Sequence, residues 1–184
     1  MDYHMISGYG ILTLVIFRVI WGLIGSTHSR FRSFVNLSEL IPHTRRLLKR
    51  DQAKIAGHNP LGALSIIAML LVLGTQATTG LFANDDIFLE GPLVHLVDDA
   101  TSDRLTTVHH FCAKALYVLI GLHLAAIIFH EIYQRERLVL PMISGYKKGL
   151  PASVDKPSFR REYVTASGLL ATCAGFVYWL VKYL

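Results

Sequence analysis

Charge and cysteine are both scarce in this sequence. Asp, Glu, Lys and Arg make up only 17% of its 184 residues, against roughly 25% in soluble domains, while 52% are hydrophobic. The two cysteines lie inside apolar runs, where a free thiol behaves as a small hydrophobic group. No Cys-x-x-Cys-His motif is present, which excludes covalent attachment of haem. The composition predicts a membrane protein, and any haem in it would be held by coordination alone.

Motifs of several enzyme classes are missing as well. The sequence contains no Gly-rich phosphate-binding loop, no nucleophile elbow, no internal repeat and no low-complexity tract. Its length leaves no room for a second globular domain of ordinary size. We therefore expect a single domain over residues 1–184.

Four apolar runs are present, and each is about as long as a membrane is thick. They cover residues 6–26, 60–82, 106–133 and 163–183, and a spanning helix needs about 20 apolar residues. None of the runs alternates apolar and polar residues as a strand would. Because backbone groups in lipid must be hydrogen-bonded internally, helices are favoured. We predict an all-α fold, an integral membrane helical bundle with four transmembrane helices in this chain.

The loops between these runs differ in charge. The first and third loops are basic: Arg30, Arg32, Arg45, Arg46, Lys49, Arg50 and Lys54, then Arg135, Arg137, Lys147, Lys148, Lys156, Arg160 and Arg161. The middle loop is acidic: Asp85, Asp86, Glu90, Asp98, Asp99 and Asp103 against Arg104. Basic loops stay on the cytoplasmic side, so both termini are predicted to face outward. The net charge of +5 is thus a topology signal, compatible with contacts to membrane lipid, and needs no nucleic acid.

Two histidines in the third run share one face of the expected helix. A helix turns about 100° and rises about 1.5 Å per residue, so His109 and His123 differ by about 40° in direction and about 21 Å in height. By the same geometry, His110 points about 140° away from His123. Ionisable groups at such depth are costly and often mark a functional pathway, and imidazole is a common ligand of iron. The pair suggests two stacked planar cofactors.

Candidate partners for these histidines lie in the first run. His4 is expected at the depth of His109, because the first and third helices run in the same direction. Gly8, one turn further along, leaves room for a flat macrocycle. Arg18 is expected near the height of His123, where it would pair with a propionate or another carboxylate. The alternatives are a mobile His4 and an Arg18 that extends to the inner interface.

Several stretches of this sequence together carry a resemblance to a known family. They are RVIWGLIGSTHSRF (18–31), GHNPLGALSIIAMLLVLGTQATTGLF (57–82), the helix with His109 and His123, and RERLVLPMISGYKKG (135–149). In this combination the chain closely resembles the bacterial cytochrome b561 family, over nearly its whole length. That family includes the b-type cytochrome subunit of nickel-iron hydrogenases.

The resemblance implies a fold, a cofactor and a function. The fold would be an antiparallel bundle in the bacterial inner (cytoplasmic) membrane, with both termini periplasmic. The bundle would hold one or two non-covalent haem b groups, with His4, His109 and His123 as iron ligands. The function would be electron transfer between the quinone pool and a partner redox protein, such as a periplasmic c-type cytochrome, a hydrogenase or another dehydrogenase. Quinone is then a second ligand, and quinol oxidation or quinone reduction the only catalysis expected.

The family's usual first helix is absent from the expected fold. That helix bears a histidine near its cytoplasmic end, and no histidine of the first two helices here lies at the depth of His123. Four possibilities stay open for the inner site. A separate helix or subunit completes it, an upstream helix does so, Met69 supplies a thioether ligand, or only the outer haem binds. A missing or separately supplied helix is favoured.

Further polar residues near the inner interface are candidates for contacts with haem propionates or a quinone headgroup. His28 and His58 lie in motifs of the family, and His130 follows His123 by two helical turns. Polar side chains at a membrane interface need no function, so an ordinary interfacial role is the alternative for each.

Two other functions remain open from the sequence. A proton-coupled transporter would use buried His and Arg side chains as a relay, and the purified protein would be colourless. A membrane anchor without redox activity would tolerate replacement of His109 or His123.

Overall fold

Four long helices dominate the computed structural model, which describes residues 2–26, 29–34, 60–85, 89–133, 139–140 and 159–184. The helices are α1 (Asp2–Ile24), α4 (Pro60–Gly80), α5 (Asp99–Ile128) and α7 (Phe159–Tyr183). Shorter elements are helix α2 (Phe31–Phe34), the 3-10 turn η2 (Val94–Leu96) and the π-helical turn η3 (Phe129–Tyr133), which extends α5. Within the described ranges there is no β-strand, only an isolated bridge between Asn84 and Glu90. The predicted all-α fold is confirmed.

Each predicted apolar run corresponds to one of the long helices, and all four are long and apolar enough to cross a membrane. The largest difference is at α5, which begins at Asp99 and not at residue 106. The preceding residue explains the earlier start, because the Asp98 carboxylate accepts a hydrogen bond from the Thr101 backbone N–H at 2.7 Å. This is an N-cap, which stabilises a helix beginning in polar sequence.

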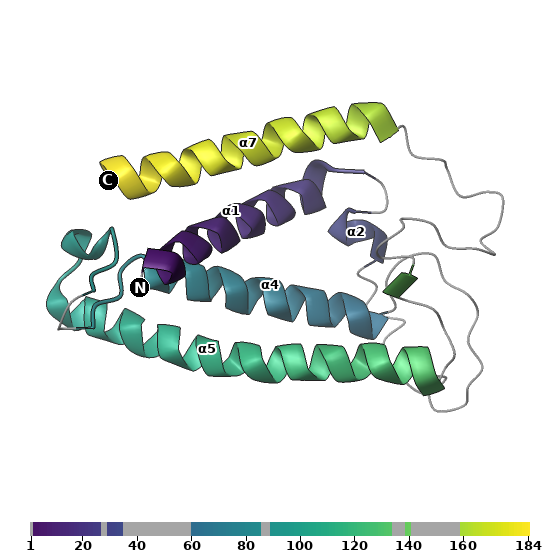
Figure 1. Ribbon diagram of the computed structural model, residues 1–184, viewed down its shortest axis with the longest axis horizontal. Helices are drawn as coiled ribbons and strands as arrows, with labels where there is room; N and C mark the ends of the chain where they lie inside the picture. The colour runs from purple at the N-terminus through teal and green to yellow at the C-terminus, as the bar shows by residue number, and fades with distance from the viewer. Residues whose placement is uncertain (1, 27–28, 35–59, 86–88, 134–138, 141–158) are drawn as a thin grey trace.

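The long helices lie side by side in the order α7, α1, α4, α5 (Figure 1). Successive helices run in opposite directions, so both ends of the described chain and the segment after α4 gather at one end of the bundle. The end of the chain is tied to that segment, since the His95 ring donates from Nε2 to the backbone oxygen of Leu184 at 2.6 Å. The predicted antiparallel bundle therefore brings the start of α1 close to the start of α5.

Burial in this bundle is the reverse of that in a soluble protein. Large apolar side chains such as Leu71, Phe111 and Tyr117 are exposed on the long helices. A contiguous apolar surface of this kind is stable only against lipid or protein. The described core is small and consists of Leu12, Leu81, Leu93 and Val177.

The segment after α4 folds back on the helix end and closes this core. Leu93 donates from its backbone N–H to the Leu81 carbonyl at 2.9 Å, and Gly91 to Ala83 at 2.7 Å. Gly91 lies directly against the Leu81 carbonyl, where a side chain would collide. Ser102 of α5 is buried and donates to the Phe82 carbonyl at 2.8 Å. These contacts fix the start of α5 against the end of α4.

Candidate functional site

His4 of α1 and His109 of α5 face each other at the end of the bundle. Their ring centres are 6.1 Å apart, and the ring planes are inclined at 79°. His4 is exposed, whereas His109 is partly buried against α4. The expectation that these two histidines lie at one depth agrees with this placement.

Helix α4 holds the His109 ring from one side. The Nδ1 atom donates to the backbone carbonyl of Gln76 at 2.9 Å, and the Thr79 hydroxyl lies 3.4 Å from the same nitrogen. The other nitrogen, Nε2, lies 2.9 Å from Nε2 of the Gln76 side-chain amide. A carbonyl can only accept, so the proton resides on Nδ1, and Nε2 keeps its lone pair.

Gly80 provides the space for this ring. A Cβ atom at Gly80 would lie 2.9 Å from Cε1 and 3.2 Å from Nδ1 of His109, closer than such contacts normally are. A larger residue would push the ring away from α4. On the opposite side, Gly8 of α1, one turn beyond His4, has no neighbouring atom within 4 Å of its Cβ position, which leaves α1 open beside His4.

The ring spacing of the histidine pair is that of two imidazoles that share one haem iron, while Nε2 of His109 is directed at Gln76 in this structure. Metal–nitrogen bonds to imidazole are about 2 Å long, so two imidazoles on opposite sides of one iron have ring centres about 6 Å apart. The Nδ1–H bond to a backbone carbonyl is the arrangement that commonly orients a metal-ligating histidine. Within the described ranges, no group of three or more His, Cys, Asp or Glu side chains could enclose a bare ion. A donor set of two histidines suits a metal whose other ligands come from a macrocycle.

His123 lies partly buried on α5, fourteen residues beyond His109. Among the described residues, none forms a hydrogen bond or ring contact with it, and no second histidine faces it. Met69 of α4 is also partly buried. His110 is exposed and its ring centre lies 6.3 Å from that of His109.

The remaining predicted site residues are separate from this pair. Arg18 donates from Nη1 to the Ser29 carbonyl at 3.2 Å, and its guanidinium lies 4.8 Å from the centre of the Phe31 ring. Arg18 therefore braces the turn between α1 and α2. His130 is buried in η3 beside Phe129, with ring centres 5.9 Å apart. His28 and His58 fall outside the described residues.

Gln76 was not expected in the site. Its side-chain oxygen Oε1 is buried and accepts no hydrogen bond from any described residue. The signal available in the sequence was an amide within an apolar run, one turn before Gly80. A ligand bound at Nε2 of His109 would replace the amide, which would then be free to turn toward that ligand.

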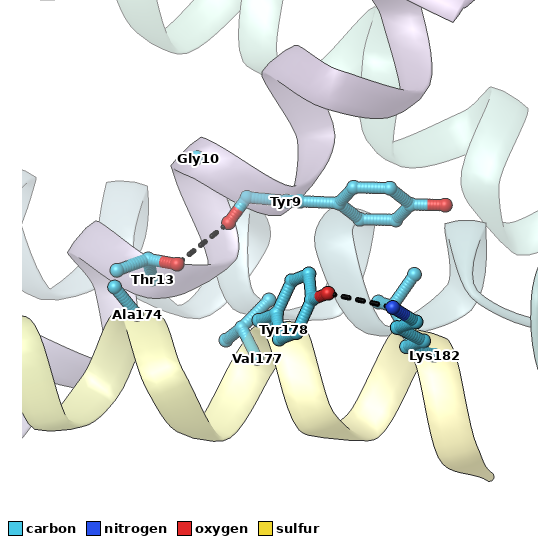
Figure 2. A pocket seen from close by; sticks show the side chains of 8 residues that line it. Tyr9, Gly10, Thr13, Ala174, Val177, Tyr178 and Lys182 are labelled. Atoms are coloured by element: carbon cyan, nitrogen blue, oxygen red, sulfur yellow. Dashed lines mark hydrogen bonds between the residues drawn. The ribbon is translucent and has the colours of Figure 1, made fainter.

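A separate groove lies between α1 and α7, with a volume of about 450 Å³ (Figure 2). Its floor includes Gly10, Ala174 and Val177, and at one end the Lys182 ammonium donates to the Tyr178 hydroxyl at 2.9 Å. No histidine lines it. An apolar groove of this kind suits a lipid chain and is distinct from the histidine pair.

Comparison with known proteins identifies one family. The family model described as prokaryotic cytochrome b561 matches residues 1–145. The match includes α1, α4 and α5, and with them His4, His109 and His123.

Several curated relatives carry one name, probable Ni/Fe-hydrogenase B-type cytochrome subunit. The Azotobacter vinelandii protein is 26% identical over 166 residues, which cover 78% of this chain and 66% of that protein. The Bradyrhizobium diazoefficiens protein is 24% identical, with 79% and 65% covered, and the Rhizobium leguminosarum bv. viciae protein is 28% identical, with 77% and 66% covered. The chain thus spans slightly less than two thirds of the length of these relatives. No solved structure matches.

Proposed function

The chain belongs to the prokaryotic cytochrome b561 family, and from this premise we propose that it is a membrane-embedded b-type cytochrome that transfers electrons between the quinone pool and a partner redox protein. The partner is a periplasmic c-type cytochrome, a hydrogenase or another dehydrogenase. The single domain spans residues 1–184 and binds haem b without covalent attachment. The observation that carries this proposal is the 6.1 Å separation of the His4 and His109 ring centres.

His4 and His109 would hold the outer haem, and His123 one side of an inner haem. Bound haem would supply a one-electron couple between Fe(II) and Fe(III). The chain contributes the position and protonation of its imidazoles. Because the Gln76 carbonyl accepts from Nδ1 of His109 at 2.9 Å, that ring presents an unprotonated Nε2 without a prior proton transfer. His4 and His109 would together hold the haem, and a haem bound by two histidines would carry electrons and not bind oxygen or substrate.

The charge of the bundle end that carries this pair supports an outward-facing redox partner. Residues 84–104 form most of the connection from α4 to α5 and the first turns of α5, and their charges are mainly acidic. Acidic surfaces attract basic partners. Because basic loops are retained in the cytoplasm, an acidic connection favours the periplasmic side. We therefore place the outer site and both termini at the periplasmic face of the inner membrane.

The alternative functions differ from the proposed one in whether the purified protein would contain haem. A transporter with a His and Arg relay needs no haem, and an anchor needs no redox-active group. Arg18 contacts Ser29 and Phe31, which follow the end of its own helix. These contacts do not link Arg18 to a histidine, so they do not support a proton relay.

The test is the spectrum and haem content of the purified chain, with a quinol as reductant. We expect a Soret band that shifts on addition of quinol, and we expect its loss in His109→Ala. The matched control is His110→Ala, because His110 is exposed and adjacent but is not a proposed ligand. A colourless protein, or equal haem content in wild type and His109→Ala, would contradict the proposal.

A further inference from the structure

Lys114 is an exposed lysine inside an apolar membrane span. It lies on α5 within the span Asp99–Tyr133. At a rise of about 1.5 Å per residue, it is about 12 Å beyond residue 106, where the apolar run begins. It is also about 7.5 Å farther into the bundle than His109, whose ring contacts the end of α4 at Gly80.

No described residue neutralises this charge. The described part of the chain offers Lys114 neither a hydrogen bond nor an ion pair, and its side chain is exposed. Its neighbours Phe111 and Val118 are exposed and apolar. An ammonium reaches about 6 Å from its Cα atom, which is about half of the distance back to residue 106. A charged group at such depth is stable only when it is paired or faces other protein.

The residues around Lys114 resemble a helix–helix contact. Four exposed residues share an arc of about 60° on α5, given a turn of about 100° per residue: His110, Lys114, Tyr117 and Gly121. Tyr117 is 78% exposed, and nothing lies within 4 Å of a Cβ placed on Gly121. Polar groups beside a glycine are typical of interfaces between membrane helices. This set is called the Lys114 face.

We propose that the Lys114 face is covered by a transmembrane helix, other than the four described, that carries an Asp or Glu side chain opposite Lys114. The charge sets the chemistry of the partner, because an ammonium in a low-dielectric environment needs an anion.

A second copy of this chain is excluded as the occupant by the positions of its acidic residues. In a second copy of this chain, the acidic residues of the four spans lie near span ends: Asp99, Asp103, Glu131 and Glu162. None of them could reach Lys114 at its depth in a parallel or antiparallel pair without displacing a span from the membrane.

This inference requires insertion in the membrane but not haem, so it stands apart from the proposed function.

Photo-crosslinking in native membranes tests the proposal. The full chain is expressed in its own host with a photoreactive amino acid at position 117, and the adducts are identified by mass spectrometry. The control carries the same probe at position 122, because Leu122 is also exposed but points about 140° away from Tyr117. We expect position 117 to yield a transmembrane peptide with Asp or Glu within one turn of the adduct, and position 122 to yield lipid.

The charge is tested in the same membranes. Polar contacts between membrane helices are worth up to about 1.7 kcal/mol, so Lys114→Gln should lower the yield at position 117 by about threefold or more, whereas Lys114→Arg should retain it. The amount of inserted chain, measured by immunoblot, normalises the yields. Adducts only to lipid, only to a second copy, or to a helix without an acid would overturn the proposal. An unchanged yield in Lys114→Gln would also overturn the proposal. If that variant lost haem as well, Lys114 would instead be assigned to a haem propionate.

Discussion

Gly80 sets how closely α4 approaches the imidazole of His109. A Cβ at this position would lie 2.9 Å from the ring, so Gly80→Ala should displace the ring by a few tenths of an ångström. Overpacking of this kind costs about 1–3 kcal/mol, while alanine returns about 0.5–1 kcal/mol through helix propensity. We expect a lower thermal stability of the haem-loaded chain in detergent, with a shifted reduction potential.

Gly10→Ala is the matched control for that substitution. Gly10 also lies in a long helix, and no atom lies within 4 Å of its Cβ position. Alanine there should raise stability slightly and leave the spectrum and potential unchanged. Equal behaviour of the two variants would show that Gly80 does not constrain the ring.

At the scale of single residues, helical geometry predicted the facing pair but not its surroundings. His4 and His109 followed from equal depth on two helices that run in the same direction. Gln76 could not be found this way, because its contact depends on how α4 rotates about its axis. Arg18 was placed by depth alone, whereas the chain after Gly25 turns back and brings Ser29 and Phe31 to it.

Asp98 determines where α5 begins, and its action depends on pH. The hydrogen bond from the Thr101 backbone N–H lowers the pKa of the Asp98 carboxyl below its usual value. A depressed pKa in the folded state means that the ionised cap stabilises the helix start above about pH 4, the unfolded value, and loses this effect as the pH falls through the folded pKa. The protection factor of the amides in the first turn of α5, measured against the intrinsic exchange rate at each pH, should therefore fall on acidification below pH of about 4.

Two variants separate the cap from its charge. Asp98→Asn keeps a side-chain oxygen for the Thr101 N–H without titrating, so the protection factor at the helix start should become independent of pH in this range. Asp98→Ala should show a lower protection factor at every pH. A loss of protection in acid that persists in Asp98→Asn would assign the effect to another group.

At the scale of elements, apolar length predicted which segments are helices but not where they end. The four runs appear as α1, α4, α5 and α7. The extra turns of α5 come from the polar residues between Asp99 and Leu105, which hydropathy scores as loop. There the N-cap of Asp98 and the hydrogen bond of buried Ser102 to Phe82 favour a helix. Tertiary contacts of this kind are not visible in local composition.

The whole bundle has one acidic end, and its orientation can be measured. Both ends of the described chain lie at the end of the bundle that carries the acidic segment between α4 and α5 (Figure 1). Since basic loops are retained in the cytoplasm, we expect reporter fusions after Leu184 to be active as alkaline phosphatase and inactive as a cytoplasmic fluorescent protein. Fusions in the basic loop at residues 27–59 should give the opposite result. Inverted activities at both sites would reverse the proposed orientation.

The number of bound haem groups tests whether this chain alone can hold one haem at the depth of His109 and a second at the depth of His123. The outer level has two facing histidines, His4 and His109, whereas His123 at the inner level faces none among the described residues. We therefore expect the purified chain to bind one haem by pyridine haemochrome assay, and to approach two only in membranes that contain its redox partners. His109→Ala should abolish haem in the purified chain, and His123→Ala should lower the content only in those membranes. Two haems in the purified chain would contradict this expectation, and a drop to one in Met69→Leu would then assign the sixth inner ligand to the Met69 thioether.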